Sequence, residues 1–125
     1  MEGKPRVVVL DDNEVYAALM AAALEEDFEV AVGHNGLQGI ALCLESRPAA
    51  LVTDIGMPEF DAIQMLGEFA KNPALNTIPV VVVTATHFTR LSRDAVARYP
   101  QVTGIFSKTE DVCAIADEVR RIVRR

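Results

Sequence analysis

Five side chains that could perform phosphate chemistry stand at or directly after the ends of short apolar runs. They are Asp11, Asp12, Asp54, Thr84 and Lys108. If the runs are neighbouring parallel strands, these side chains meet at the carboxyl edge of one sheet, which is where open α/β sheets place their functional sites. The sequence therefore predicts three carboxylates, a hydroxyl and an ammonium in one place.

Crowded carboxylates repel one another, and a cation relieves the repulsion. Mg²⁺ (or Mn²⁺) suits this set, because it accepts a few carboxylates, keeps several waters and uses phosphate oxygens as further ligands. A carboxylate can also attack phosphorus and carry the phosphoryl group, a role that fits Asp54 in its Gly56- and Pro58-containing loop. Lys108 would supply the opposing charge, and the Thr84 hydroxyl would donate to a phosphoryl oxygen.

Over its whole length the chain resembles the receiver domain of two-component response regulators, the CheY-like family. The motifs that carry the resemblance are Asp11-Asp12, Asp54-x-x-Met57-Pro58, Thr84-Ala85 and Lys108. The resemblance implies that Asp54 is the phosphoacceptor and that Thr84 and Lys108 sense the phosphoryl group. It also implies a metal held mainly by Asp12, with Asp11 supporting and the Gly56 carbonyl as a further ligand. The donor would be a phosphohistidine on a sensor histidine kinase or phosphotransfer protein.

Three departures from the family pattern concern output rather than chemistry. Ile105 stands where receivers usually carry an aromatic residue, and strand alternation places Phe106 on the opposite face. The common lysine–proline peptide is Lys108-Thr109, which we expect to be trans. The usual Met-Pro-Gly-x-Asp-Gly loop reads Met57 to Ala62, with Glu59 at the first glycine. We expect coupling through the fifth strand to be weak and the segment Ala85–Leu91 to respond instead.

Strand and helix patterns alternate along the chain, which predicts a parallel sheet covered on both faces. The expected strands are Arg6–Leu10, Phe28–Val32, Ala50–Thr53, Ile78–Val83 and Gly104–Ser107. The expected helices are Glu14–Glu26, Leu37–Ser46, an Asp61-capped helix to Lys71, one over Leu91–Tyr99 and one from about Glu110. The fold class is a single (βα)5 flavodoxin-like doubly wound sheet, and the family implies the strand order 2-1-3-4-5. Residues 1–125 are expected to form one receiver domain without an output domain.

The first helix carries two apolar stripes. Val15, Ala18, Leu19 and Ala22 are the expected core stripe. The second stripe comprises Tyr16, Met20 and Ala23, and it either packs on the last helix or forms a partner surface next to Asp12. The buried stripe of the last helix is expected to comprise Val112, Ile115, Ala116, Val119, Ile122 and Val123.

Composition narrows the function classes. A net charge of -6 over 125 residues argues against direct nucleic-acid binding. The basic cluster at residues 120–125 is expected to be favourable charge at a helix C-terminus. No run approaches the roughly 20 apolar residues that span a bilayer. Cys43 and Cys113 match no metal spacing, and two buried or half-buried thiols favour a cytoplasmic protein.

The leading interpretation is a phosphoacceptor switch that signals to a downstream protein target and is not an enzyme with a separate substrate. The alternative is a phosphorylation-independent interaction module on the same fold, which the departures at Ile105 and Thr109 favour. An aspartyl phosphohydrolase would need a second aspartate where Gly56 stands. His87 could contact phosphate, although an exposed loop histidine is the simpler interpretation, and His34 is expected in a turn.

Overall fold

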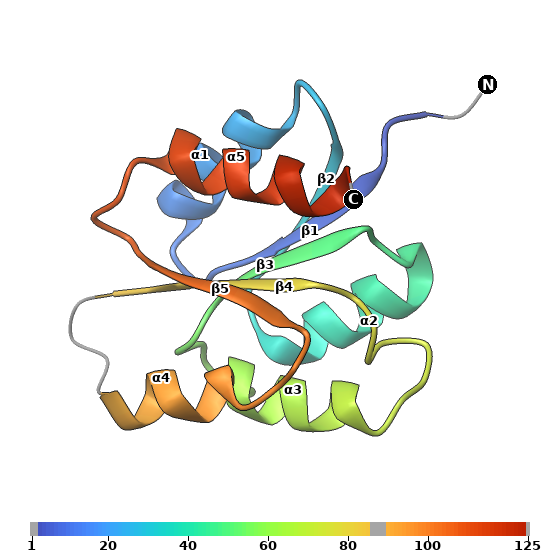
Figure 1. The fold of residues 1–125 in the computed structure, drawn as a ribbon, viewed down its shortest axis with the longest axis vertical. Helices are drawn as coiled ribbons and strands as arrows, with labels where there is room; N and C mark the ends of the chain where they lie inside the picture. The colour runs from blue at the N-terminus through green and yellow to red at the C-terminus, as the bar shows by residue number, and fades with distance from the viewer. Residues whose placement is uncertain (1–2, 86–89, 125) are drawn as a thin grey trace.

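A central parallel sheet carries helices on both of its faces (Figure 1). The computed structural model describes residues 3–85 and 90–124. The strands are β1 (Arg6–Leu10), β2 (Glu29–Gly33), β3 (Ala50–Asp54), β4 (Val80–Thr84) and β5 (Val102–Ser107). The helices are α1 (Glu14–Leu24), α2 (Gly36–Ser46), α3 (Ala62–Ala70), α4 (Arg90–Ala97) and α5 (Val112–Val123).

The strands are all parallel and run in the order β2-β1-β3-β4-β5, which confirms the expected doubly wound fold. Helices α1 and α5 cover one face, and α2, α3 and α4 cover the other (Figure 1). Most strand ends differ from the sequence prediction by one or two residues. The difference that matters is at β3, whose ladder includes Asp54 because this residue pairs with Val83 of β4.

The central strands are buried on both faces, as their continuous apolar runs predict. In β1, Val8 and Leu10 pack toward α2 and α3, whereas Val7 and Val9 pack toward α1 and α5. This alternation follows from the two-residue period of a strand. Strand β2 lies at the edge of the sheet, in agreement with the exposed Glu29 that suggested it.

The expected core stripe of α1 is wrong. Val15 is 72% exposed and Leu19 is 54% exposed, and the other two members of that stripe are exposed as well. The buried residues are Ala17, Met20 and Leu24. The helix is apolar nearly all round, so periodicity could not decide which face turns inward. The second stripe does pack in the core with α5, which confirms the simpler of its two interpretations.

The last helix has the stripe that the sequence predicts: Ile115, Ala116, Val119 and Ile122 are buried, and the two end members, Val112 and Val123, are half-buried. In α3, Ala62, Met65, Leu66 and Phe69 are buried, whereas Ala70 is exposed. Cys43 is buried, and burial raises the pKa of its thiol to about 12. Cys113 is exposed, contrary to expectation, because it lies on the outer side of α5.

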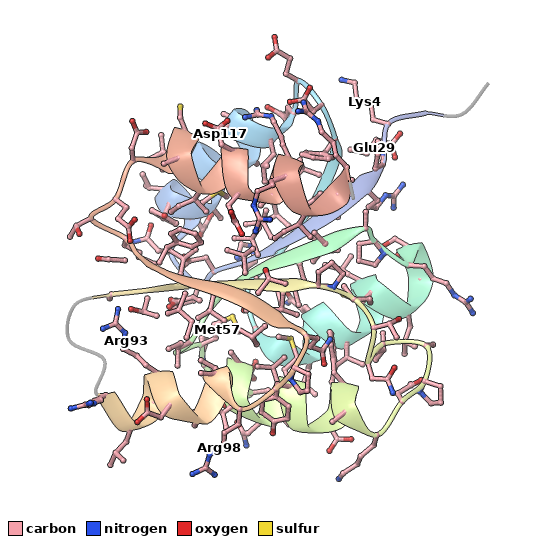
Figure 2. The ribbon with its side chains drawn as sticks, viewed as in Figure 1. Lys4, Glu29, Met57, Arg93, Arg98 and Asp117 are labelled. Carbon is pink, nitrogen blue, oxygen red and sulfur yellow. The ribbon has the colours of Figure 1, made fainter. Side chains whose placement is uncertain are left out.

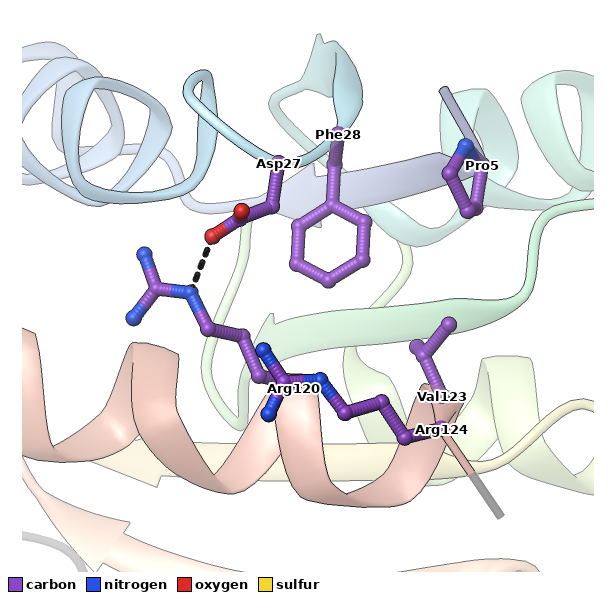
Figure 3. Close-up of a pocket in the computed structure, with 6 residues that line it drawn as sticks. All are labelled: Pro5, Asp27, Phe28, Arg120, Val123 and Arg124. Carbon is purple, nitrogen blue, oxygen red and sulfur yellow. Dashed lines mark hydrogen bonds and ion pairs between the residues drawn. The ribbon is translucent and has the colours of Figure 1, made fainter. Parts of the chain in front are cut away.

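The basic end of α5 also anchors the helix to the rest of the fold. Arg120 forms an ion pair with Asp27 after α1, a second with Asp117, and donates to the Ala23 carbonyl at 2.8 Å. A cavity of about 210 Å³ opens beside this contact, at the end of the sheet where the strands begin (Figure 3). Its lining residues are Pro5, Asp27, Phe28, Arg120, Val123 and Arg124.

Within the described residues, no helix has the length and apolarity that crossing a membrane requires.

The turn before α2 contains an Asn-Gly pair, and neither residue has a positive φ angle. Asn35 is extended, and its side chain caps α2 by accepting from the Gln38 amide at 2.9 Å. Gly36 serves a close approach instead, because its amide donates to the Phe60 carbonyl at 2.7 Å. A Cβ atom on Gly36 would lie 2.7 Å from that same oxygen. The loop after β3 therefore packs directly against the start of α2.

We expect Gly36→Ala to lower the free energy of unfolding by about 1–3 kcal/mol, because the added methyl group meets main-chain atoms that cannot rotate away. Gly67→Ala is the matched control. A Cβ there meets only the Tyr99 hydroxyl at 3.6 Å, so better helix propensity should raise stability by about 0.5–1 kcal/mol. Urea unfolding of both variants measures the difference. Equal effects in the two variants would contradict the close approach at Gly36.

Candidate functional site

The structure brings the predicted side chains together at the carboxyl ends of four neighbouring strands. Asp11 and Asp12 follow β1, Asp54 ends β3, Thr84 ends β4 and Lys108 follows β5. Asp11, Asp54 and Thr84 are buried, Lys108 is half-buried and Asp12 is exposed. The parallel topology alone accounts for this convergence, since it places every carboxyl end at one edge.

Lys108 connects two of the carboxylates. Its Nζ lies 2.8 Å from Asp11 Oδ2 and 3.3 Å from Asp54 Oδ2, and its side chain is only 20% exposed. Its main-chain amide donates to the Thr84 carbonyl at 2.8 Å, which continues the β4–β5 ladder by one residue. The ammonium is therefore held at the acidic site through both its side chain and its backbone.

The pKa of Asp54 is raised from 3.8 to about 6, first by burial and then by the nearby charge of Asp11. Contacts with Lys108 and the Ile55 amide, which donates to Asp54 Oδ1 at 2.7 Å, oppose that rise. The pKa of Lys108 is also raised, because its bonds to the two carboxylates outweigh the desolvation that lowers it. One ammonium therefore does not fully compensate two buried carboxylates.

The acidic cluster fits a divalent metal. One carboxylate oxygen from each of Asp11, Asp12 and Asp54 can lie within 4.8 Å of the others. All three donors are hard oxygens, and the raised pKa of Asp54 indicates carboxylate charge that the protein leaves uncompensated. Asp12 is the exposed member and so the one open to solvent. Gly56 follows Asp54 by two residues, and its carbonyl stays a predicted ligand.

The loop from Ser107 to Glu110 stabilises Lys108 without the family's proline. The Ser107 amide donates to Glu110 Oε2 at 2.8 Å, and the Glu110 amide donates to the Ser107 carbonyl at 3.0 Å. The Ser107 and Thr109 hydroxyls lie 2.8 Å apart. The Lys108–Thr109 peptide is trans, as expected. Side-chain hydrogen bonds thus shape this turn locally.

The residues around the missing aromatic position behave as strand alternation predicts. Ile105 packs with the cluster under α3 and α4, and Phe106 packs with the cluster under α1 and α5. Residues Thr86, His87 and Phe88 lie outside the described residues, as does most of the segment expected to respond in place of the ring. The expectations for that segment and for His87 stay predictions.

The loop after Asp54 also replaces a family glycine. Glu59 stands in the left-handed region at φ 68°, which favours glycine. Its Oε1 accepts from Asn35 Nδ2 at 3.0 Å, which ties the strained residue to the start of α2. Met57 turns into the core under α3 (Figure 2). Asp61 caps α3 with a reciprocal bond to Gln64, as its position predicted.

Sequence reasoning missed two contacts at the site. His34 is exposed, but its Nδ1 lies 3.0 Å from the Asp11 carbonyl. The Tyr16 ring lies under Lys108, with Nζ 4.8 Å from the ring centre. No local sequence pattern pointed to either contact.

A family model described as the response regulator receiver domain matches residues 7–120. The chain belongs to this family, whose members are receivers in two-component signal transduction. It is 26% identical over 120 residues to a protein named probable transcriptional regulator ycf29 of Pyropia yezoensis, an alignment that covers 95% of this chain and 53% of that protein.

It is 37% identical over 82 residues to the transcriptional regulatory protein PrrA of Mycobacterium tuberculosis, which covers 65% of this chain and 34% of that protein. The chain thus spans between a third and about half of these two relatives. Its fold matches the receiver domain of the sensor histidine kinase PA1611 from Pseudomonas aeruginosa, a structure with magnesium coordinated in its active-site cleft. The TM-score is 0.86 at 16% identity, covering 98% of this chain and 100% of the other.

We expect Asp54→Asn to raise the free energy of unfolding at pH 7 by about 2 kcal/mol in the absence of metal. Between about pH 4 and 6 the Asp54 carboxyl is protonated in the folded state and ionised in the unfolded state. Ionising Asp54 therefore lowers stability as pH rises through that window, and asparagine carries no such cost. The gain should shrink toward pH 4.

Urea unfolding in EDTA at several pH values measures this gain, with Asp94→Asn on the exposed side of α4 as the control. A gain that does not change with pH, or a loss of stability at pH 7, would show that Asp54 is not the strained carboxylate.

Proposed function

We propose that Asp54 accepts a phosphoryl group from a phosphohistidine donor in a reaction that depends on Mg²⁺. The observation that carries the proposal is a buried carboxylate at a strand end, with the Lys108 ammonium 3.3 Å away and two further carboxylates beside it. The chain would then be a switch that a downstream protein reads. We place the reaction in the cytoplasm, a setting in keeping with the two free thiols.

In the transfer, an Asp54 carboxylate oxygen forms a bond to phosphorus while the bond from phosphorus to the donor's imidazole nitrogen breaks. The nitrogen keeps the electron pair. Lys108 moves its hydrogen bonds from the carboxylates toward the phosphoryl oxygens, and the Thr84 hydroxyl donates to another. A metal held by Asp12, Asp11, Asp54 and the Gly56 carbonyl would neutralise charge on the incoming phosphate. The same site would allow slow hydrolysis of the acyl phosphate.

We propose that the donor docks on the outer α1 stripe, which comprises Val15, Ala18, Leu19 and Ala22. This stripe is apolar, exposed and starts three residues after Asp12. Donors of known receivers commonly approach this side of the site. Packing against the stripe would remove apolar area from water, which is the main favourable term in protein association.

Incubation with acetyl phosphate and Mg²⁺ should add one phosphoryl group, measured by intact-mass spectrometry. A small donor needs only positioning and charge neutralisation, which the site offers without a kinase. The modification should disappear with EDTA and in Asp54→Ala. It should slow by about 100-fold in Lys108→Ala. Asp12→Ala should require more Mg²⁺.

If the wild type stays unmodified with acetyl phosphate and with phosphoramidate, the phosphorylation-independent interaction module becomes the better interpretation. Phosphorylation that persists in Asp54→Ala would instead assign the acceptor to another residue.

Leu19→Asp should slow transfer from a phosphorylated histidine kinase fragment by about 10-fold or more, since a charge replaces an apolar contact at the centre of the stripe. The rate with acetyl phosphate should not change, because the Leu19 side chain is 54% exposed and points away from the core. Leu44→Asp on α2, which is 45% exposed, is the matched control and should leave both rates unchanged. Equal slowing in the two variants would contradict docking on α1.

A further inference from the structure

Tyr16 contacts the site through its ring rather than through its hydroxyl. Lys108 Nζ lies 4.8 Å from the centre of the ring, within the range of a cation–π interaction. The same nitrogen is bonded to Asp11 and Asp54, so the ammonium is enclosed by two carboxylates and one aromatic face. None of the motifs that identify the family includes this position.

The Tyr16 hydroxyl is buried and has no hydrogen-bond partner among the residues that the structure describes. A buried hydroxyl without a partner is destabilising, and phenylalanine would avoid that cost at the same place. The hydroxyl therefore does not account for the contact with Lys108, whereas the ring does.

The surroundings of Tyr16 keep its phenol protonated and neutral. Burial first, and then Asp11, Asp54 and Glu110, raise the pKa of the Tyr16 hydroxyl to about 12. A neutral phenol leaves the aromatic face as a partner for the ammonium at the pH values where phosphotransfer would occur.

We propose that Tyr16 is a positioning residue for phosphotransfer: its ring holds the Lys108 ammonium toward Asp54. This inference rests on the proposed function of Lys108 as a phosphoryl ligand. A lysine side chain has four rotatable bonds and loses much conformational freedom when it is held in one place. The ring restricts Lys108 from α1, while the Ser107–Glu110 turn restricts its backbone from the other side.

Tyr16→Phe and Tyr16→Leu separate the ring from the hydroxyl. Tyr16→Phe keeps the ring and should phosphorylate with acetyl phosphate within about 2-fold of the wild-type rate. Tyr16→Leu should slow the reaction by about 5- to 10-fold, the effect expected from losing one cation–π contact. Tyr16→Met is the substitute if the leucine variant folds poorly. Its flexible side chain fills the space without a ring, so the rate should fall by the same factor. Tyr99→Leu removes the other tyrosine, half-buried on the opposite face, and should leave the rate unchanged.

A double-mutant cycle tests whether the ring acts through Lys108. Tyr16→Leu should cause little further loss in the Lys108→Ala background. NMR of the unphosphorylated protein gives an independent measure, because the ring should shift the Lys108 Hε protons upfield. This shift should persist in Tyr16→Phe and disappear in Tyr16→Leu, whether or not Asp54 accepts phosphate.

Three results would overturn the inference. One is an unchanged Lys108 shift in Tyr16→Leu. Another is equal loss of rate in Tyr16→Phe and Tyr16→Leu, which would assign the effect to the hydroxyl. The third is full additivity of Tyr16→Leu with Lys108→Ala. If no phosphorylation occurs but the shift depends on the ring, positioning stands and the proposed function of the site fails.

Discussion

Burial of two carboxylates against a single ammonium is the constraint on which the site depends. Asp11 and Asp54 are almost completely removed from water, and Lys108 bridges them. Because one positive charge does not balance two negative ones in a desolvated place, the pKa of Asp54 rises to about 6. The site is thus prepared for further positive charge. The packing of the central strands, which are apolar on both faces, offsets the unfavourable free energy of burying these charges.

The elements around the site hold it from three directions. The β4–β5 ladder fixes the backbone of Lys108 to Thr84, and the Ser107–Glu110 turn closes the loop that follows. The close contact of Gly36 with Phe60 fixes the loop after Asp54 to the start of α2. The first and the last of these contacts join segments far apart in the sequence, so the geometry around Asp54 and Lys108 depends on the assembled sheet.

Local hydrogen bonds stabilise two of the loops that depart from the family pattern. Where the family has a glycine, Glu59 adopts a left-handed backbone and bonds to Asn35. In place of proline, Thr109 joins a turn shaped by Ser107. The aromatic position is different, because Ile105 packs in the core cluster on the side of α3 and α4. The five side chains predicted for the site therefore still converge, and the three departures from the family pattern lie around them rather than among them.

The sequence by itself predicted the fold class, the convergence of five polar side chains at one edge of the sheet and the Asp61 cap, because apolar periodicity and local capping are short-range properties. The strand order came from the family resemblance. The sequence could not orient α1, which is apolar on several sides, so the predicted core stripe is the exposed one. It also placed Cys113 too deep. Only the tertiary structure decided that Tyr16 lies under Lys108 and that Gly36 meets Phe60. These contacts join separate elements, and their distances are set by how helices pack on the sheet rather than by any local pattern.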